Sequence, residues 1–178
     1  MPEEPEVPME HLHDAIHEGA EQRGERWSLF VALTAALLAV FAAMTSLLAG
    51  HHANEALIEQ IQASDRWAYY QSKGIKSSVL EGKIELLRAL EKEPSAKDEE
   101  KLREYKVQQK EIEDIAREKE KSSDEHLRVH NILARAVTFF QIAIAIAAIS
   151  ILTRRKWLWI LSLVLAFGGL ASLAQGIL

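Results

Sequence analysis

The sequence predicts an all-α membrane protein: three transmembrane helices, with a long antiparallel, coiled-coil-like helical hairpin between the first and the second. Residues 27–54, 136–153 and 157–178 carry no charged side chain. A helix needs about 20 apolar residues to cross about 30 Å of hydrocarbon, so each stretch is long enough to cross or nearly so. Residues 51–133, in contrast, hold 18 of the 26 acids and 15 of the 21 bases. This segregation predicts membrane spans joined by a polar module.

Residues 1–26 are expected to form an acidic tail. Its first ten residues are rich in proline and glutamate, a composition typical of disorder. After them, Met9, Leu12, Ile16 and Ala20 follow helical spacing and predict a short amphipathic helix. This helix leads into the first span.

The three spans are predicted over residues 27–50, 135–153 and 157–177. Small residues let helices approach closely in lipid, and the first span has two overlapping ladders of alanines. These are Ala32, Ala35, Ala36, Ala39 and Ala43, with Gly168, Gly169 and Ser172 in the third span. We expect both sets to pack within one protomer. Gln141 is the strongly polar side chain in the middle of the spans, and Thr34, Thr45 and Ser150 add weakly polar hydroxyl groups.

Residues 51–134 are predicted to form the extramembrane hairpin, with a break at Glu93-Pro94-Ser95 where Ser95 can cap a new helix. Apolar or small residues recur every three or four positions on both arms and predict the seam. On the first arm they are Leu57, Ile61, Ser64, Ala68, Ile75, Val79, Gly82 and Leu86. On the second arm they are Leu102, Tyr105, Ile112, Ala116, His126, His130 and Leu133. A seam this polar buries little apolar area, and such a hairpin needs a partner surface to be stable. We therefore expect a homo-oligomer.

The loop between the second and third spans predicts the orientation. Arg154-Arg155-Lys156 is a short cationic loop, and such loops remain in the cytoplasm. The amino terminus is then cytoplasmic and the hairpin periplasmic. Arg128 and Arg135 favour the opposite orientation, but they are more dispersed.

Four histidines flank the membrane at the predicted base of the hairpin: His51, His52, His126 and His130. His126 and His130 are four residues apart, a spacing that metal sites on helices use, and Glu55 and Asp124 could add oxygen ligands. One hypothesis is therefore a site for a divalent transition metal. Ordinary polar packing at the headgroup level is the favoured alternative, and a clamp that loosens on protonation near pH 6 is a third.

An aromatic run on the first arm is a candidate interaction site. It comprises Asp65, Arg66, Trp67, Tyr69 and Tyr70. At 1.5 Å per residue these rings lie roughly 20–30 Å beyond the span, too far for an interfacial belt. We expect them to fill a contact between helices or subunits, with Asp65 or Arg66 pairing across it. Trp157 and Trp159 are instead placed as interface anchors.

Several segments resemble an uncharacterised bacterial membrane family, domain of unknown function 4337. They are HHANEA at 51–56, ASDRWAYYQSK at 63–73, FQIAIA at 140–145 and LTRRKWLW at 152–159. The resemblance extends over nearly the whole chain from about His11. It implies three spans and a helical insert, and it brings no catalytic or binding residues.

The sequence has no cysteine, no paired nucleophile and base, and no phosphate-binding loop, so we expect no enzyme and no resident cofactor. A net charge of −5 gives no reason to expect nucleic-acid binding. The leading hypothesis is a scaffold or interaction protein of the inner membrane, in contact with the lipid bilayer, with itself and with a possible envelope partner. The alternatives are an oligomeric ion channel or transport-associated protein, and a metal or pH sensor.

Overall fold

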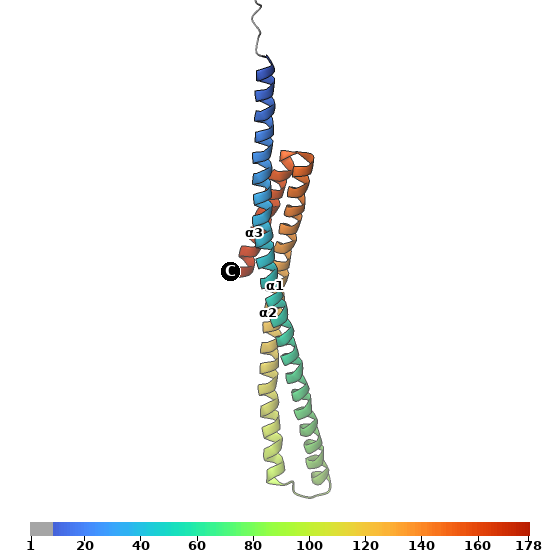
Figure 1. The fold of residues 1–178 in the computed structure, drawn as a ribbon. Coiled ribbons are helices and arrows are strands. Elements are labelled where there is room, and N and C mark those ends of the chain that lie inside the picture. The colour runs from blue at the N-terminus through green and yellow to red at the C-terminus, as the bar shows by residue number, and fades with distance from the viewer. Residues whose placement is uncertain (1–8) are drawn as a thin grey trace, which may run out of the picture. The chain divides into compact units, whose positions relative to one another are not determined.

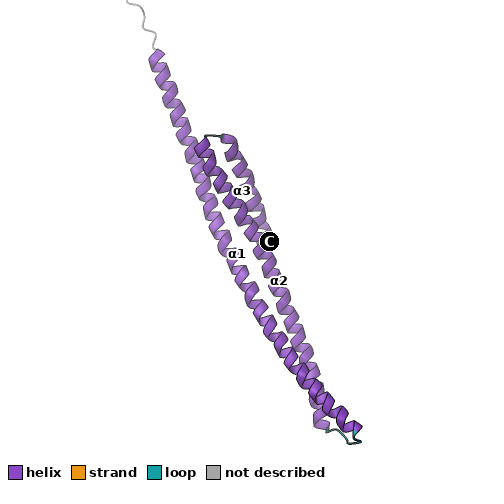
Figure 2. Ribbon diagram, turned by 90° about the vertical axis from the view of Figure 1, so that its right-hand side faces the viewer, coloured by secondary structure: helices purple, strands orange, loops and turns teal. Residues whose placement is uncertain are grey.

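The predicted all-helical class is confirmed. A computed structural model of the chain describes residues 9–178, with side chains from Arg26 onward, and these residues contain no strand (Figures 1 and 2). The helices are α1 (Met9–Ala89), α2 (Ala96–Thr153) and α3 (Lys156–Ile177). Each includes a stretch that is long and apolar enough to cross a membrane.

The acidic tail is described only in part: residues 9–26 are helical, as the start of α1. The disorder expected at the start of the chain falls largely on residues that the structure does not describe. The apolar face of Met9, Leu12, Ile16 and Ala20 precedes the first described side chain.

The chain divides into two compact units. The first, called here the apolar unit, contains the chain up to Leu47 and Ile132–Leu178. The second is Leu48–Asn131, in which the later part of α1 and the earlier part of α2 lie antiparallel, and it is called here the polar helix pair (Figure 1).

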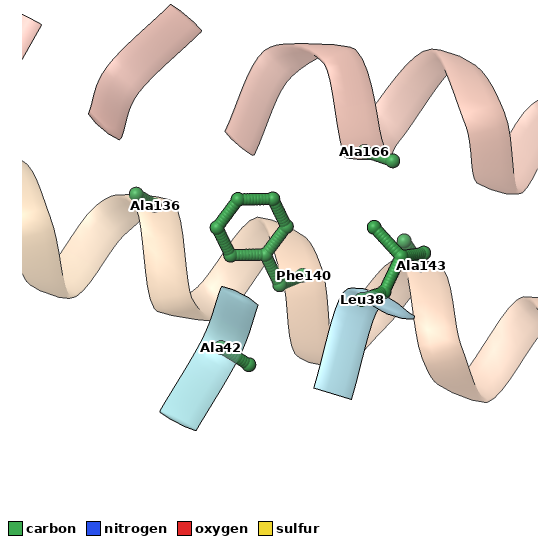
Figure 3. Close-up of a cluster of buried hydrophobic side chains, with 6 residues drawn as sticks. All are labelled: Leu38, Ala42, Ala136, Phe140, Ala143 and Ala166. Atoms are coloured by element: carbon green, nitrogen blue, oxygen red, sulfur yellow. The ribbon is translucent and has the colours of Figure 1, made fainter. Parts of the chain in front are cut away.

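The core of the apolar unit is built from small side chains around one ring. Phe140 of α2 is fully buried between Leu38 and Ala42 of α1 and Ala166 of α3 (Figure 3). A Cβ added at Gly169 would lie 2.7 Å from Cε1 of Phe140, so only glycine lets the α3 backbone pass the ring at this distance. The expected close packing at Gly169 is therefore present.

Four of the five ladder alanines of α1 do not take part in this packing, and the fifth, Ala35, is half-buried. The buried positions of this segment are Val31, Leu38, Ala42 and Thr45, whereas Ala32, Ala36, Ala39 and Ala43 are exposed. The expectation that the ladders pack within one protomer is wrong for these four alanines. The physical reason is that Leu38, Ala42 and Thr45 face the core, and the ladder positions lie on another side of the helix.

The two turns between the helices use the same backbone geometry. Glu91 and Arg154 both adopt positive φ, at 54° and 51°. The amide of Lys92 donates to the carbonyl of Leu87, and that of Arg155 donates to the carbonyl of Ser150. A left-handed residue followed by such a bond is the Schellman way of ending a helix, and glycine is the residue most often found there. Here two charged residues occupy the position.

Candidate interaction face and histidine cluster

The contact between the two helices of the polar pair uses small side chains of α1. Its buried positions recur every seven residues: Ala49, Ala56, Ala63, Ser77 and Ile84, with half-buried Tyr70 in the same series. Ser123 of α2 is buried against this series and donates its hydroxyl to the Ala56 carbonyl at 2.8 Å. Alanine lets the two backbones come close, and a seven-residue repeat is the period of a left-handed coiled coil.

Of the residues expected to form the seam of the second arm, Ile112 and Ala116 are buried and Leu102, Tyr105, His126 and His130 are half-buried. Leu133 is also buried, but it belongs to the apolar unit. The seam expected for the first arm is wrong. All of its members are exposed: Leu57, Ile61, Ser64, Ala68, Ile75, Val79, Gly82 and Leu86. Most of them are two residues from a buried position, which is about 200° around the helix. They therefore lie roughly opposite the contact with α2.

We call these eight residues, together with the half-buried Ser72 and the exposed Leu90, the α1 stripe. Its members show an eleven-residue repeat, which gives about 3.67 residues per turn and keeps the stripe nearly straight along the helix. One series of this repeat is Leu57, Ala68, Val79 and Leu90, and another is Ser64, Ile75 and Leu86. The stripe contains no charged residue, although charged residues are frequent on the rest of the pair.

The aromatic run joins the two helices through Trp67. Its indole Nε1 donates a hydrogen bond to Oε1 of Glu120 at 2.8 Å, and the guanidinium of Arg117 lies 5.7 Å from the ring centroid. Tyr70 meets the Trp67 ring edge-to-face, with centroids 5.4 Å apart. Glu113 forms a hydrogen bond with Arg117, and this bond raises the pKa of the Arg117 guanidinium, which stays charged. Trp67 thus contacts both a negative and a positive side chain.

The other members of the run are placed differently. Lys73 lies between Tyr69 and Tyr105, with its Nζ 5.3 and 5.1 Å from their ring centroids. Asp65 and Arg66 are exposed, and neither forms an ion pair among the described residues. The pairs between α1 and α2 are instead Lys83–Asp98, Arg88–Glu99, Lys106–Glu81 and Lys119–Glu59. Sequence spacing did not identify these partners.

The four histidines lie close together, but each contact among them joins only two groups. The Nδ1 atoms of His52 and His126 are 3.0 Å apart, so one ring donates and the other accepts. His130 directs its Nδ1 to the carbonyl of Ala49 at 2.8 Å, and the rings of His51 and His52 meet edge-on at 5.5 Å.

Partial burial lowers the pKa of His52, as do the positive charges that His126 and His51 would carry. The nearby carboxylate of Glu55 acts in the opposite direction, and His130 adds a smaller lowering. The arrangement therefore favours the neutral form of the His52 imidazole.

In the part of the chain with described side chains, no group of three or more His, Cys, Asp or Glu residues is close enough together to hold a metal ion. His52 and His126 could supply two nitrogens. His130 uses one of its two ring nitrogens, Nδ1, for the contact with the Ala49 carbonyl, and Asp124 is exposed. The geometry resembles a hydrogen-bonded clasp between two helices more than a metal centre.

Polar groups of the apolar unit fall into two classes. Thr34, Thr45 and Ser150 donate their hydroxyls to carbonyls of their own helices, which satisfies them locally. Gln141 is exposed on the surface of the unit. Of the expected interface anchors, Trp157 is exposed and Trp159 is half-buried.

Of the comparisons with known proteins, only the comparison with family models gives a match. A family model described as "Domain of unknown function (DUF4337)" matches residues 27–178. No curated protein and no solved structure matches the chain. The matched range covers the whole polar helix pair and the apolar unit from residue 27 onward.

Proposed function

The chain belongs to the DUF4337 family, and for this member we propose a multi-pass protein of the bacterial inner membrane that acts without catalysis as an oligomeric scaffold. Residues 27–50, 135–153 and 157–177 cross the bilayer, and the polar helix pair is a hairpin inserted between the first two spans. The amino terminus is cytoplasmic and the hairpin periplasmic, since Arg154, Arg155 and Lys156 are retained on the cytoplasmic side.

The α1 stripe carries this proposal. A helix pair that is stable in water without a partner exposes few large aliphatic side chains, because exposing apolar surface to water costs free energy. Here Leu57, Ile75 and Leu86 are each at least 60% exposed, while charged side chains cover other parts of the same helix. Such a surface gains free energy when another helix covers it. The exposed aliphatic surface of the apolar unit is explained by lipid, but the polar hairpin has no lipid around it.

The absence of cysteine makes the topology simple to test, because each introduced cysteine is unique. Ser95→Cys in the turn between α1 and α2 is expected to react with a membrane-impermeant maleimide in intact cells. Thr153→Cys, at the end of α2, is expected to react only after the inner membrane is permeabilised. The reverse pattern would contradict the proposed orientation, and release of the protein by alkaline carbonate would contradict membrane insertion.

The scaffold itself is tested by the oligomeric state of the purified protein in detergent, measured by light scattering. A complex of two or more copies supports the proposal. A monomer at all concentrations, also in reconstituted bilayers, would contradict it.

One observation favours a second candidate, an oligomeric channel or transport-associated protein. Gln141 is exposed on an apolar surface, and an amide there is satisfied when it meets the same residue of other copies. Conductance in planar bilayers that is abolished by Gln141→Leu and retained in Thr138→Val would support it. Thr138 is a suitable control because its hydroxyl already donates to the Ala134 carbonyl of the same helix. A silent wild-type bilayer contradicts this candidate.

A further inference from the structure

We infer that the α1 stripe is covered by the α1 stripe of a second copy of the same chain, in parallel and in register. This inference rests on the proposed function and names its partner surface.

The composition of the stripe selects the class of partner. It has no charge with which to attract an acidic or basic protein, and its spacing of three and four residues is that of a coiled-coil face. A complementary surface must therefore be another uncharged helix face of the same period. The part of the chain with described side chains itself provides one such face.

Membrane anchoring selects the direction and the register. The polar helix pair begins at Leu48, at the end of the first apolar segment, in every copy. Two copies inserted in the same orientation therefore have their α1 helices parallel and at the same level. In that register Ile75 meets Ile75, and the small residues Ser64 and Ala68 meet their own counterparts, so the helices can approach there.

The exposed area is compatible with a dimer that uses more than this stripe. Six aliphatic side chains of the stripe are 54–69% exposed: Leu57, Ile61, Ile75, Val79, Leu86 and Leu90. Full burial of one such side chain is worth about 1.5–3 kcal/mol, which at about 25 cal/mol per Å² corresponds to about 60–120 Å². Six side chains that are a little over half exposed therefore offer at most roughly 400 Å² per copy, or about 800 Å² in total. A specific interface buries about 1,200 Å² or more, so a further contact is required.

The apolar unit provides that contact independently. Ala32, Ala36, Ala39 and Ala43 are exposed on the same helix, spaced by four, three and four residues. Between helices in lipid, such small residues permit close backbone packing. Lipid alone would not require small side chains at these positions. The co-anchored copies also have a high effective concentration, which lowers the affinity that each contact must supply.

Cysteine crosslinking in the full-length membrane protein tests the surface. Under mild oxidation, Ser64→Cys and Ser72→Cys are expected to form disulfide-linked dimers. Gln62→Cys is the matched control for Ser64→Cys, because Gln62 is also exposed but lies off the stripe, and it is expected to remain monomeric. Equal crosslinking of all three variants, or none at the stripe positions, would overturn the inference.

A charge exchange tests the register. Ile75→Lys and Ile75→Glu are each expected to weaken self-association about 100-fold, the factor that corresponds to about 3 kcal/mol. Co-expression of the two variants is expected to restore association, because in register the opposite charges meet. No restoration would overturn the parallel, in-register arrangement. Since Ile75 is 66% exposed, neither change disturbs the contact with α2.

The outcomes also separate this inference from the proposed function. If the Ile75→Lys variant remains oligomeric and the Ser64→Cys variant forms no crosslink, the proposed scaffold is retained but the α1 stripe is not its contact surface. A wild-type protein that is monomeric in bilayers removes both.

Discussion

The apolar unit and the polar helix pair are both packed through small residues, but they differ in what secures the contact and in what remains outside. In the apolar unit, Gly169 admits the fully buried ring of Phe140, and large aliphatic side chains are exposed in all three helices. In the helix pair, the buried alanines of α1 are accompanied by polar bonds such as that of Trp67 with Glu120. Under the proposed function, exposure has two meanings in this chain: a lipid-facing surface in one unit and an incomplete contact in the other.

The largest expected effect concerns the polar bonds. Trp67→Ala is expected to destabilise the helix pair by about 2–4 kcal/mol, because it removes a half-buried ring and leaves Glu120 without its donor. Hydrogen exchange measured by mass spectrometry on the full-length protein reports the change. Tyr69→Ala, at an exposed position, is the control and is expected to change exchange little. Equal effects of the two variants would show that Trp67 does not secure the contact.

The second effect concerns the apolar unit. Gly169→Ala is expected to cost about 1–3 kcal/mol, because the new methyl group overlaps the Phe140 ring. Gly168→Ala is the matched control, since its Cβ would lie 3.8 Å from the Phe139 ring, an ordinary contact. Thermal unfolding in detergent measures both, and a larger loss for Gly168→Ala would refute the packing described.

The third effect concerns how the stability of the polar helix pair depends on pH. The folded pKa of His52 lies below its ordinary value of 6.5, so between these two values the unfolded chain binds more protons than the folded chain. Stability of the helix pair is therefore full above pH 6.5 and falls as the pH drops below it. Exchange of residues 48–131, corrected for the intrinsic rate, is expected to increase from pH 7.5 to pH 5, and His52→Gln is expected to reduce that increase. An unchanged pH dependence in this variant would contradict the prediction.

The smallest effect concerns the turn between α1 and α2. Glu91→Gly is expected to stabilise the helix pair by up to about 1 kcal/mol, because glycine adopts the positive φ of this position without a Cβ penalty. Glu91→Ala is the control, since it removes the charge but keeps the Cβ. Exchange of the turn amides, beginning with Lys92, distinguishes them. A gain in both variants would assign the effect to charge.

The sequence predicted the class of fold and the ends of the helices better than it predicted which faces meet. Charge-free stretches and the Glu93-Pro94-Ser95 break are local signals, and α1 and α2 end and begin close to that break. Apolar spacing, however, identifies faces that avoid water without saying which partner covers them. On α2 the spaced residues meet α1, whereas on α1 the aliphatic residues were assigned to the contact that Ala56 and Ala63 actually make.

The candidate sites show the same limit. Closure of the polar pair was enough to anticipate that His52 and His126 approach each other. The ring orientations that turn His130 to a carbonyl, and the choice of Glu120 as the partner of Trp67, depend on side-chain packing. Linear spacing carries no information on those choices.

The left-handed backbone of Arg154 has a consequence for how this chain tolerates change. Glycine would relieve the backbone there, yet it would delete one of the three cations that we propose hold the loop in the cytoplasm. Replacing Arg154 by glycine would then make the folded molecule more stable and, at the same time, increase the fraction of molecules inserted with inverted topology. Selection for correct insertion and selection for thermal resistance oppose each other at this one residue, so a screen for heat-resistant variants would need a second screen for orientation.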